Sequence, residues 1–115
     1  VTAIKGNAVA GKWTVATQLA QDRLERFRHA PWDNIASSAS GGYNTGTMLP
    51  NYANLPGAAG DTSTVRGTSY HRVWYVSSNA GNTLKTITVW CCWQDDSQGW
   101  HEVMLVSQRS NVGGT

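Results

Sequence analysis

The side chains best suited to chemistry include three histidines, and each lies in a different segment. His29 follows a helical pattern, whereas His71 and His101 belong to two segments of alternating character. A shared site requires a fold that brings His71 and His101 together across adjacent strands. We therefore predict separate histidines, solvated or in contact with a neighbouring strand, rather than a metal-binding or catalytic cluster.

Two adjacent cysteines are the next candidates. In an extended segment the side chains of Cys91 and Cys92 point to opposite faces, and a disulfide between neighbours would strain the backbone. Zinc binding requires a second Cys or His pair at ligand spacing, which the sequence lacks. We predict two small, half-buried strand residues, with an intermolecular or redox role as the alternative.

The remaining polar groups show no catalytic arrangement. Asp95, Asp96 and Glu102 carry carboxylates, but their spacing is not that of a calcium loop, and an acidic hairpin tip explains them. The sequence contains neither a Gly-x-Ser-x-Gly elbow nor a glycine-rich phosphate loop before a helix. We predict no enzyme, no catalytic residue, no cofactor and no metal.

Six tryptophans in 115 residues suggest a contact surface. Stacking on sugars or single-stranded nucleic acid is one use of such rings, but few basic residues lie among them, so we expect no nucleic-acid partner. Trp90 and Trp93 are three positions apart in one segment, so a regular strand directs them to opposite faces. We expect most of the six rings to pack in the core and the sheet, but at least one of Trp90 and Trp93 to face solvent unless a bulge intervenes. Trp90, Trp93 and Trp100 are the candidate exposed aromatic contacts.

Composition limits the chain to one modest folded domain. It has 115 residues and a mass of 12.4 kDa, with 40% hydrophobic residues and a formal net charge of +2. This balance excludes a disordered chain and implies no polyanionic partner. No apolar run approaches the roughly 18 residues that span a bilayer.

The pattern of residues 1–30 predicts a long helix, and this helix positions His29. Apolar residues recur at spacings of 4, 3, 4, 4 and 3, which places them on one stripe. The stripe comprises Val9, Trp13, Ala16, Ala20, Leu24 and Phe27. Pro31 ends the pattern. No capping signal precedes the helical pattern, so we expect a helix cut at its N-terminus.

A loop and then a sheet follow. Residues 36–64 predict a long surface loop, because residues 37–60 carry no charge and show no period. Met48, Leu49, Tyr52 and Leu55 are its expected anchors. Residues 65–110 alternate with period two between turns and predict a three- to four-stranded antiparallel meander. The resulting class is α+β, with the helix packed on one sheet face in a single domain of residues 1–115.

Two segments resemble a known family. Ala16 to Arg28 fit A-x-Q-L-A-Q-D-x-L-E-x-[FLM]-R and are followed by Pro31, Trp32 and Asp33. This stretch resembles the end of the N-terminal helix of type IV pilins and pseudopilins, above all PilV-type (pilus modification) minor pilins and GspI-type minor pseudopilins. The runs SYHRVWYVSSN and LKTITVWCCWQDDSQGWHEVMLV resemble that family's C-terminal meander. The likeness covers residues 1–35 and 65–110.

The resemblance implies a type IV pilin fold whose apolar half-helix, in the inner membrane, precedes the present sequence. It implies a non-enzymatic minor subunit that primes or modifies a type IV pilus. The partners are then other major and minor pilins. The subunit faces the periplasm before assembly and later lies in an extracellular pilus or a periplasmic pseudopilus. Arg23, Glu25, Arg26 and Arg28 are the assembly contacts that it suggests.

Two alternatives remain open at this point. One is a minor pseudopilin of a type II secretion system, which neighbouring genes would distinguish. The other is a secreted binding module that uses exposed tryptophans and the uncharged loop. Many major pilins close a C-terminal loop with a disulfide between distant cysteines. Cys91 and Cys92 cannot do so, which favours a minor subunit.

Overall fold

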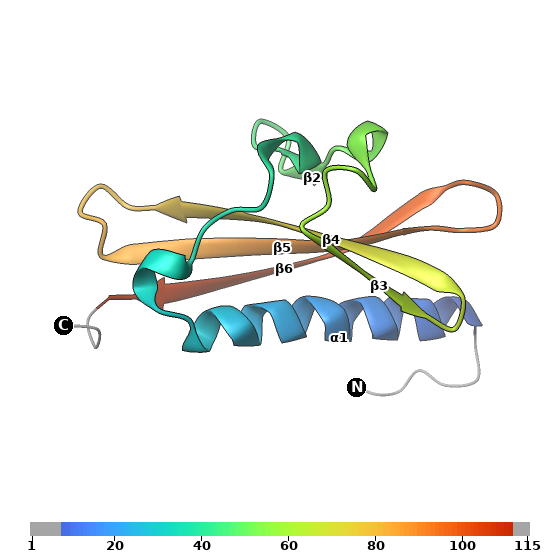
Figure 1. The fold of residues 1–115 in the computed structure, drawn as a ribbon, viewed down its shortest axis with the longest axis horizontal. Coiled ribbons are helices and arrows are strands. Elements are labelled where there is room, and N and C mark those ends of the chain that lie inside the picture. Colours follow the sequence, from blue (N-terminus) through green and yellow to red (C-terminus); the bar gives the residue numbers. More distant parts are fainter. Residues whose placement is uncertain (1–7, 112–115) are drawn as a thin grey trace.

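The computed structural model describes residues 8–111, with side chains from residue 11 on. The molecule has three layers: the helix α1 (Ala8–His29), a four-stranded sheet, and a loop region on the opposite face of the sheet (Figure 1). The α+β class predicted from the sequence is confirmed. The predicted start of the helix before residue 8, and its expected truncation, lie outside the described residues.

The large sheet is an antiparallel meander of four strands. They are β3 (Asp61–Val65), β4 (Thr68–Ser78), β5 (Leu84–Gln94) and β6 (Trp100–Ser110), hydrogen-bonded in that order. The sheet begins at Asp61, before the predicted start at Val65. Arg66 and Gly67 have φ of 52° and 83°, and this tight turn folds a short polar strand onto β4.

The predicted apolar stripe of α1 faces the sheet. Ala16 and Ala20 are fully buried, Phe27 is 3% exposed and Leu24 is half-buried. Small residues in the middle of the stripe let the helix approach β5 and β6 closely. Trp13 is 37% exposed at one edge, although its ring lies 4.9 Å from that of Trp93, centroid to centroid. The side chain of Val9 lies outside the described part.

Three cations from the sheet bind main-chain carbonyls of the helix and its connection. Arg72 donates to the Leu19 carbonyl at 2.9 Å, while its Nε and Nη2 bind both carboxylate oxygens of Asp61 at 2.6 and 2.7 Å. Lys85 donates to the carbonyls of Trp32 and Ile35. The third cation, Arg109 of β6, donates to the carbonyl of Phe27 at the end of α1. These bonds give each buried charge a partner and hold α1 in place.

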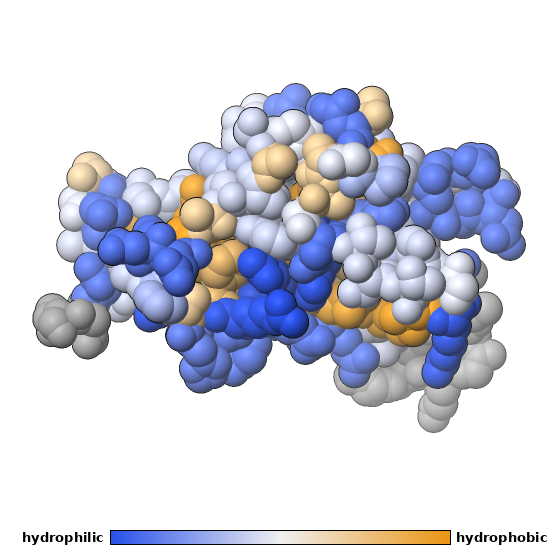
Figure 2. Space-filling model, in the orientation of Figure 1, coloured by the Kyte–Doolittle hydropathy of each residue, from blue (hydrophilic) through white to orange (hydrophobic). Residues whose placement is uncertain are grey.

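The loop region covers the other face of the sheet. It contains the paired strands β1 (Tyr43–Asn44) and β2 (Leu49–Pro50) and 3-10 helices at Trp32–Asn34, Ser40–Gly42 and Tyr52–Asn54. The predicted anchors Met48, Tyr52 and Leu55 pack against a cluster formed by Val73, Trp90 and Cys92. Leu49, predicted as a fourth anchor, is 46% exposed. Apolar patches remain visible between hydrophilic groups over this side of the molecule (Figure 2).

Candidate functional site

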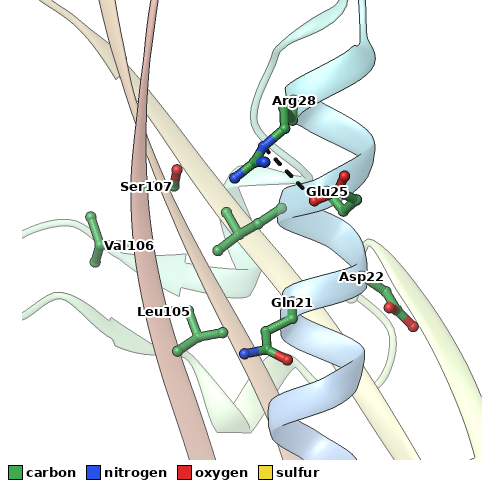
Figure 3. A pocket seen from close by; sticks show the side chains of 8 residues that line it. Gln21, Asp22, Glu25, Arg28, Leu105, Val106 and Ser107 are labelled. Carbon is green, nitrogen blue, oxygen red and sulfur yellow. Dashed lines mark ion pairs between the residues drawn. The ribbon is translucent and has the colours of Figure 1, made fainter.

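A groove runs between α1 and the outer strand β6. Its volume is about 510 Å³, and it is lined by Gln21, Asp22, Leu24, Glu25, Arg28, Leu105, Val106 and Ser107. Arg28 points from the helix toward β6, and Gln21 points toward Leu105 (Figure 3). Asp22 points away from the strand. The groove therefore has an apolar floor and a helix wall that carries charges of both signs.

Three of the four predicted assembly contacts are exposed, and two of them, Glu25 and Arg28, line this groove. Glu25, Arg26 and Arg28 lie on the outer side of the last turns of α1. Glu25 pairs with Arg28 at 3.8 Å and with His29 at 3.1 Å. Such exposed pairs contribute only a few tenths of a kcal/mol to stability. Glu25 and Arg28 can therefore exchange this pairing for partners on another molecule at little cost.

Arg23, the fourth predicted contact, is half-buried rather than exposed. Its guanidinium carbon lies 3.9 Å from the centroid of the Trp74 ring and 4.8 Å from that of Phe27, so the side chain lies over the core. Desolvation by burial lowers the pKa of Arg23. Arg23 packs between helix and sheet through cation–π contacts with Trp74 and Phe27.

The prediction that at least one of Trp90 and Trp93 faces solvent is wrong. Trp90 is fully buried and Trp93 is 2% exposed, even though they occupy opposite faces of β5 as predicted. No bulge is required, because the register of β5 with β4 and β6 runs without interruption. Trp93 lies under α1, whereas Trp90 stacks on Tyr43 of the loop region. Trp100 is half-buried and stacks on Tyr52 at 5.2 Å.

The fold keeps the three histidines apart. His29 contacts Glu25 on the exposed side of α1. His71 is buried on β4 and binds the Thr62 hydroxyl at 2.9 Å. His101 lies on β6 and pairs with Asp95 at 2.8 Å. Since β5 separates β4 from β6, the condition for a shared histidine site is not met.

Both cysteines are free and fully buried, more deeply than the predicted half-burial. They point to opposite faces, Cys91 toward the helix side and Cys92 toward the loop side. Burial raises the pKa of Cys91 to about 12 and raises that of Cys92 as well. Protonated, inaccessible thiols are poor nucleophiles and poor metal ligands, so this placement argues against the redox alternative.

The acidic hairpin tip has a structural role. One carboxylate oxygen of Asp95 accepts hydrogen bonds from the backbone N–H groups of Ser97 and Gly99, and the other binds His101. These bonds close the β5–β6 turn and lower the pKa of Asp95. Within residues 8–111, no group of three or more His, Cys, Asp or Glu side chains is arranged to hold a metal ion.

No protein-family model, curated protein or solved structure matches the chain. In the described part, no helix is both long and apolar enough to cross a membrane. Function must therefore be inferred from the geometry of the helix, the sheet and the groove between them.

Several important residues are absent from the sequence prediction. The alternating pattern places Leu105 to Ser107 in a strand but does not show that they form a wall of the groove. The sequence does contain a signal for Arg72. It shares a strand face with Tyr70 and Trp74, and a charge on such an apolar face predicts a buried partner of opposite charge. Its partner Asp61 lay in the segment predicted as loop.

Proposed function

We propose that this chain is the globular part of a minor pilin that primes or modifies a type IV pilus. The observation that carries the proposal is the placement of α1. One side of the helix packs on an antiparallel meander, while Glu25, Arg26 and Arg28 remain exposed on the last turns. These are the positions at which the family resemblance locates neighbouring subunits.

In this proposal the chain acts by assembly rather than by catalysis. An apolar helix that leads into α1 holds the subunit in the inner membrane, and the filament gathers such helices at its centre with the sheet domains outside. Partners are then other pilin subunits. The exposed charges select neighbours mainly through electrostatic complementarity, which sets orientation more than affinity.

A minor pseudopilin of a type II secretion system would use the same geometry and remains the second candidate. The secreted binding module loses its main support, because Trp90 and Trp93 are buried and the uncharged loop covers the sheet. Genes beside the coding sequence distinguish the two filament systems, since each is encoded with its own secretion or pilus machinery.

The first test is to read the coding sequence immediately upstream of Val1. The proposal expects a short basic leader ending in Gly, followed by about 20 apolar residues with a Glu near their start. An ordinary secretory signal or another folded domain at that place would refute filament assembly.

A second test measures assembly in cells. Arg26→Glu reverses an exposed charge, so the domain should fold with an unchanged thermal midpoint while the number of pili falls. Arg66→Glu, in the exposed β3–β4 turn, is the matched control and should leave pilus number unchanged. A normal number of pili with Arg26→Glu would show that Arg26 is not an assembly contact.

A further inference from the structure

The two faces of the sheet have cores of very different size. Helix α1 and the loop region lie on opposite faces (Figure 1). In the described chain, the core beneath α1 contains ten buried residues, whereas the core beneath the loop region contains three, Val73, Trp90 and Cys92. The Trp90 indole N–H is also buried without a hydrogen-bond partner in that part of the chain. The smaller core buries less apolar surface and leaves a polar group unpaired, so the loop region should open at a lower free energy than α1.

His71 is buried on the face that the loop region covers. It lies opposite Cys92 in the register of β4 and β5, and its Nδ1 is 2.9 Å from the Thr62 hydroxyl of β3. The centroid of its ring is 5.9 Å from that of Trp100. The Trp100 ring stacks in turn on Tyr52 of the loop region, with centroids 5.2 Å apart. Ring contacts therefore connect the loop region to His71 on the sheet.

The groups around His71 on β3, β5 and the loop region carry no negative charge in mild acid. Thr62 presents a hydroxyl, while the adjacent Asp61 projects to the helix side of the sheet. Burial raises the pKa of the Cys92 thiol, so this group stays protonated. Residues 37–60, in the covering loop region, contain no charged side chain. A protonated His71 is thus a buried cation beneath an uncharged cover, which is unfavourable without water.

Glu102 of β6 projects to the same face of the sheet but does not compensate such a charge. It and His71 lie on either side of Cys92, so the width of β5 separates them. Burial raises the pKa of Glu102, and its carboxylate therefore becomes neutral at a higher pH than an exposed one. Desolvation lowers the pKa of His71 below its ordinary value of 6.5. As the pH falls, this face loses negative charge while a solvated imidazolium becomes more favourable than a buried imidazole.

We propose that protonation of His71 releases the loop region from the sheet while α1 stays packed on the other face. The imidazolium reaches water only when its cover lifts, so the open state binds a proton more readily than the closed state does. Acid therefore shifts the equilibrium toward the open state. Opening exposes Trp90 and Cys92, which the closed loop region hides. This response to pH does not depend on the proposed pilus function.

The adjacent cysteines report on the two faces separately. Cys92 lies under the loop region and Cys91 under α1, so Cys91→Ala and Cys92→Ala each leave one reporter thiol. Both chains are labelled with a pyridyl disulfide, which reacts with thiols in mild acid. Each rate is divided by the rate for the same chain unfolded in urea at the same pH. This corrected rate should be at least about tenfold higher for Cys92 than for Cys91. Equal corrected rates would mean that only global unfolding exposes the thiols, and would overturn the proposal.

The pH dependence of the Cys92 rate tests the role of His71. Release linked to one proton with an ordinary pKa of 6.5 raises the corrected rate by at most about elevenfold between about pH 8 and about pH 5.5. We expect a rise of about three- to tenfold. His71→Gln, made in the Cys91→Ala chain, keeps a hydrogen-bonding group beside Thr62 but does not titrate, and its rate should not rise. A constant rate with His71 present, or the same rise with His71→Gln, would overturn the proposal.

Two loop variants test the cover without changing any charge. Tyr52→Ala removes the ring that stacks on Trp100 and should raise the corrected Cys92 rate at both pH values. Leu49→Ala, at a loop side chain that is 46% exposed, is the matched control and should leave the rate unchanged. Equal rates for the two variants would show that Cys92 is reached without movement of the loop region, which overturns the proposal.

Hydrogen exchange followed by NMR tests the chain without any substitution. The Ser38 N–H donates to the Trp74 carbonyl at 3.0 Å and ties the start of the loop region to β4. After correction for the intrinsic pH dependence of exchange, protection of this amide should fall about three- to tenfold between about pH 8 and about pH 5.5, relative to the Ala20 amide of α1. An equal change at both amides would indicate unfolding of the whole domain and would overturn a separate release of the loop region.

Discussion

Arg109 of β6 donates a hydrogen bond of 2.7 Å from Nη1 to the carbonyl oxygen of Phe27, in the last turn of α1. The same nitrogen also reaches the carbonyl of Ala30. The C-terminal carbonyls of a helix lack intrahelical partners and carry partial negative charge, so a guanidinium satisfies both needs. The last strand thereby closes the end of the first helix, across 82 positions of sequence.

Replacing this residue should weaken the fold. Arg109→Met keeps much of the aliphatic stem but removes the guanidinium donor from both carbonyls, and we expect a loss of about 1–3 kcal/mol in the free energy of unfolding. Urea denaturation measures it. Arg66→Met, in an exposed turn, should change stability by less than about 0.5 kcal/mol. Equal effects of the two variants would contradict the capping role.

The buried stripe of α1 makes a stronger prediction. Ala20 is fully buried against the sheet, so Ala20→Glu should destabilise the domain by at least about 3 kcal/mol or prevent folding. Leu24→Asp, half-buried in the same stripe, should act in the same direction. Gln18→Glu, exposed on α1, is the control. A thermal midpoint of Ala20→Glu equal to that of the control would show that the stripe faces solvent.

The docking of the loop region depends on a glycine. A Cβ at position 42 would lie 2.6 Å from the Ala58 carbonyl oxygen and 2.9 Å from Val73. We expect Gly42→Ala to cost about 1–3 kcal/mol through overpacking. Gly41→Ala meets its neighbours no closer than 3.6 Å and should be nearly neutral. Similar denaturation midpoints for the two variants would argue against close packing of the loop on β4.

Stability should fall in mild acid because of His71. Desolvation by burial lowers the pKa of His71 below its ordinary value of 6.5. The unfolded chain therefore binds more protons than the folded chain just below pH 6.5, and folding free energy is lost as the pH falls through that window. Between about pH 8 and about pH 5.5, wild type should lose more stability than His71→Gln.

The comparison with His71→Gln isolates this residue. Burial raises the pKa of Glu102, which has the opposite effect on stability as the pH changes, but Glu102 is present in both proteins. An identical pH dependence of wild type and variant would show that His71 is as easily protonated in the folded chain as in the unfolded one.

Periodicity alone determined the helix and the three long strands. The stripe of α1 from Ala16 to Phe27, the end before Pro31 and the alternation of the three long strands were all readable, because they arise from local backbone geometry and the burial of one face. The opposite orientations of Trp90 and Trp93 also followed from a period of two. Such features require only that each residue is compared with its near neighbours in the sequence.

Tertiary structure decided what covers each surface. Trp90 is buried because an aperiodic, uncharged loop folds back over the sheet, and no local pattern encodes that return. Arg23 lies on Trp74 and Arg72 binds Asp61 because distant segments meet there. The β6 edge and its groove exist only where the sheet ends beside α1. Contacts between residues far apart in sequence depend on the packing of whole layers, so the sequence pattern did not reveal them.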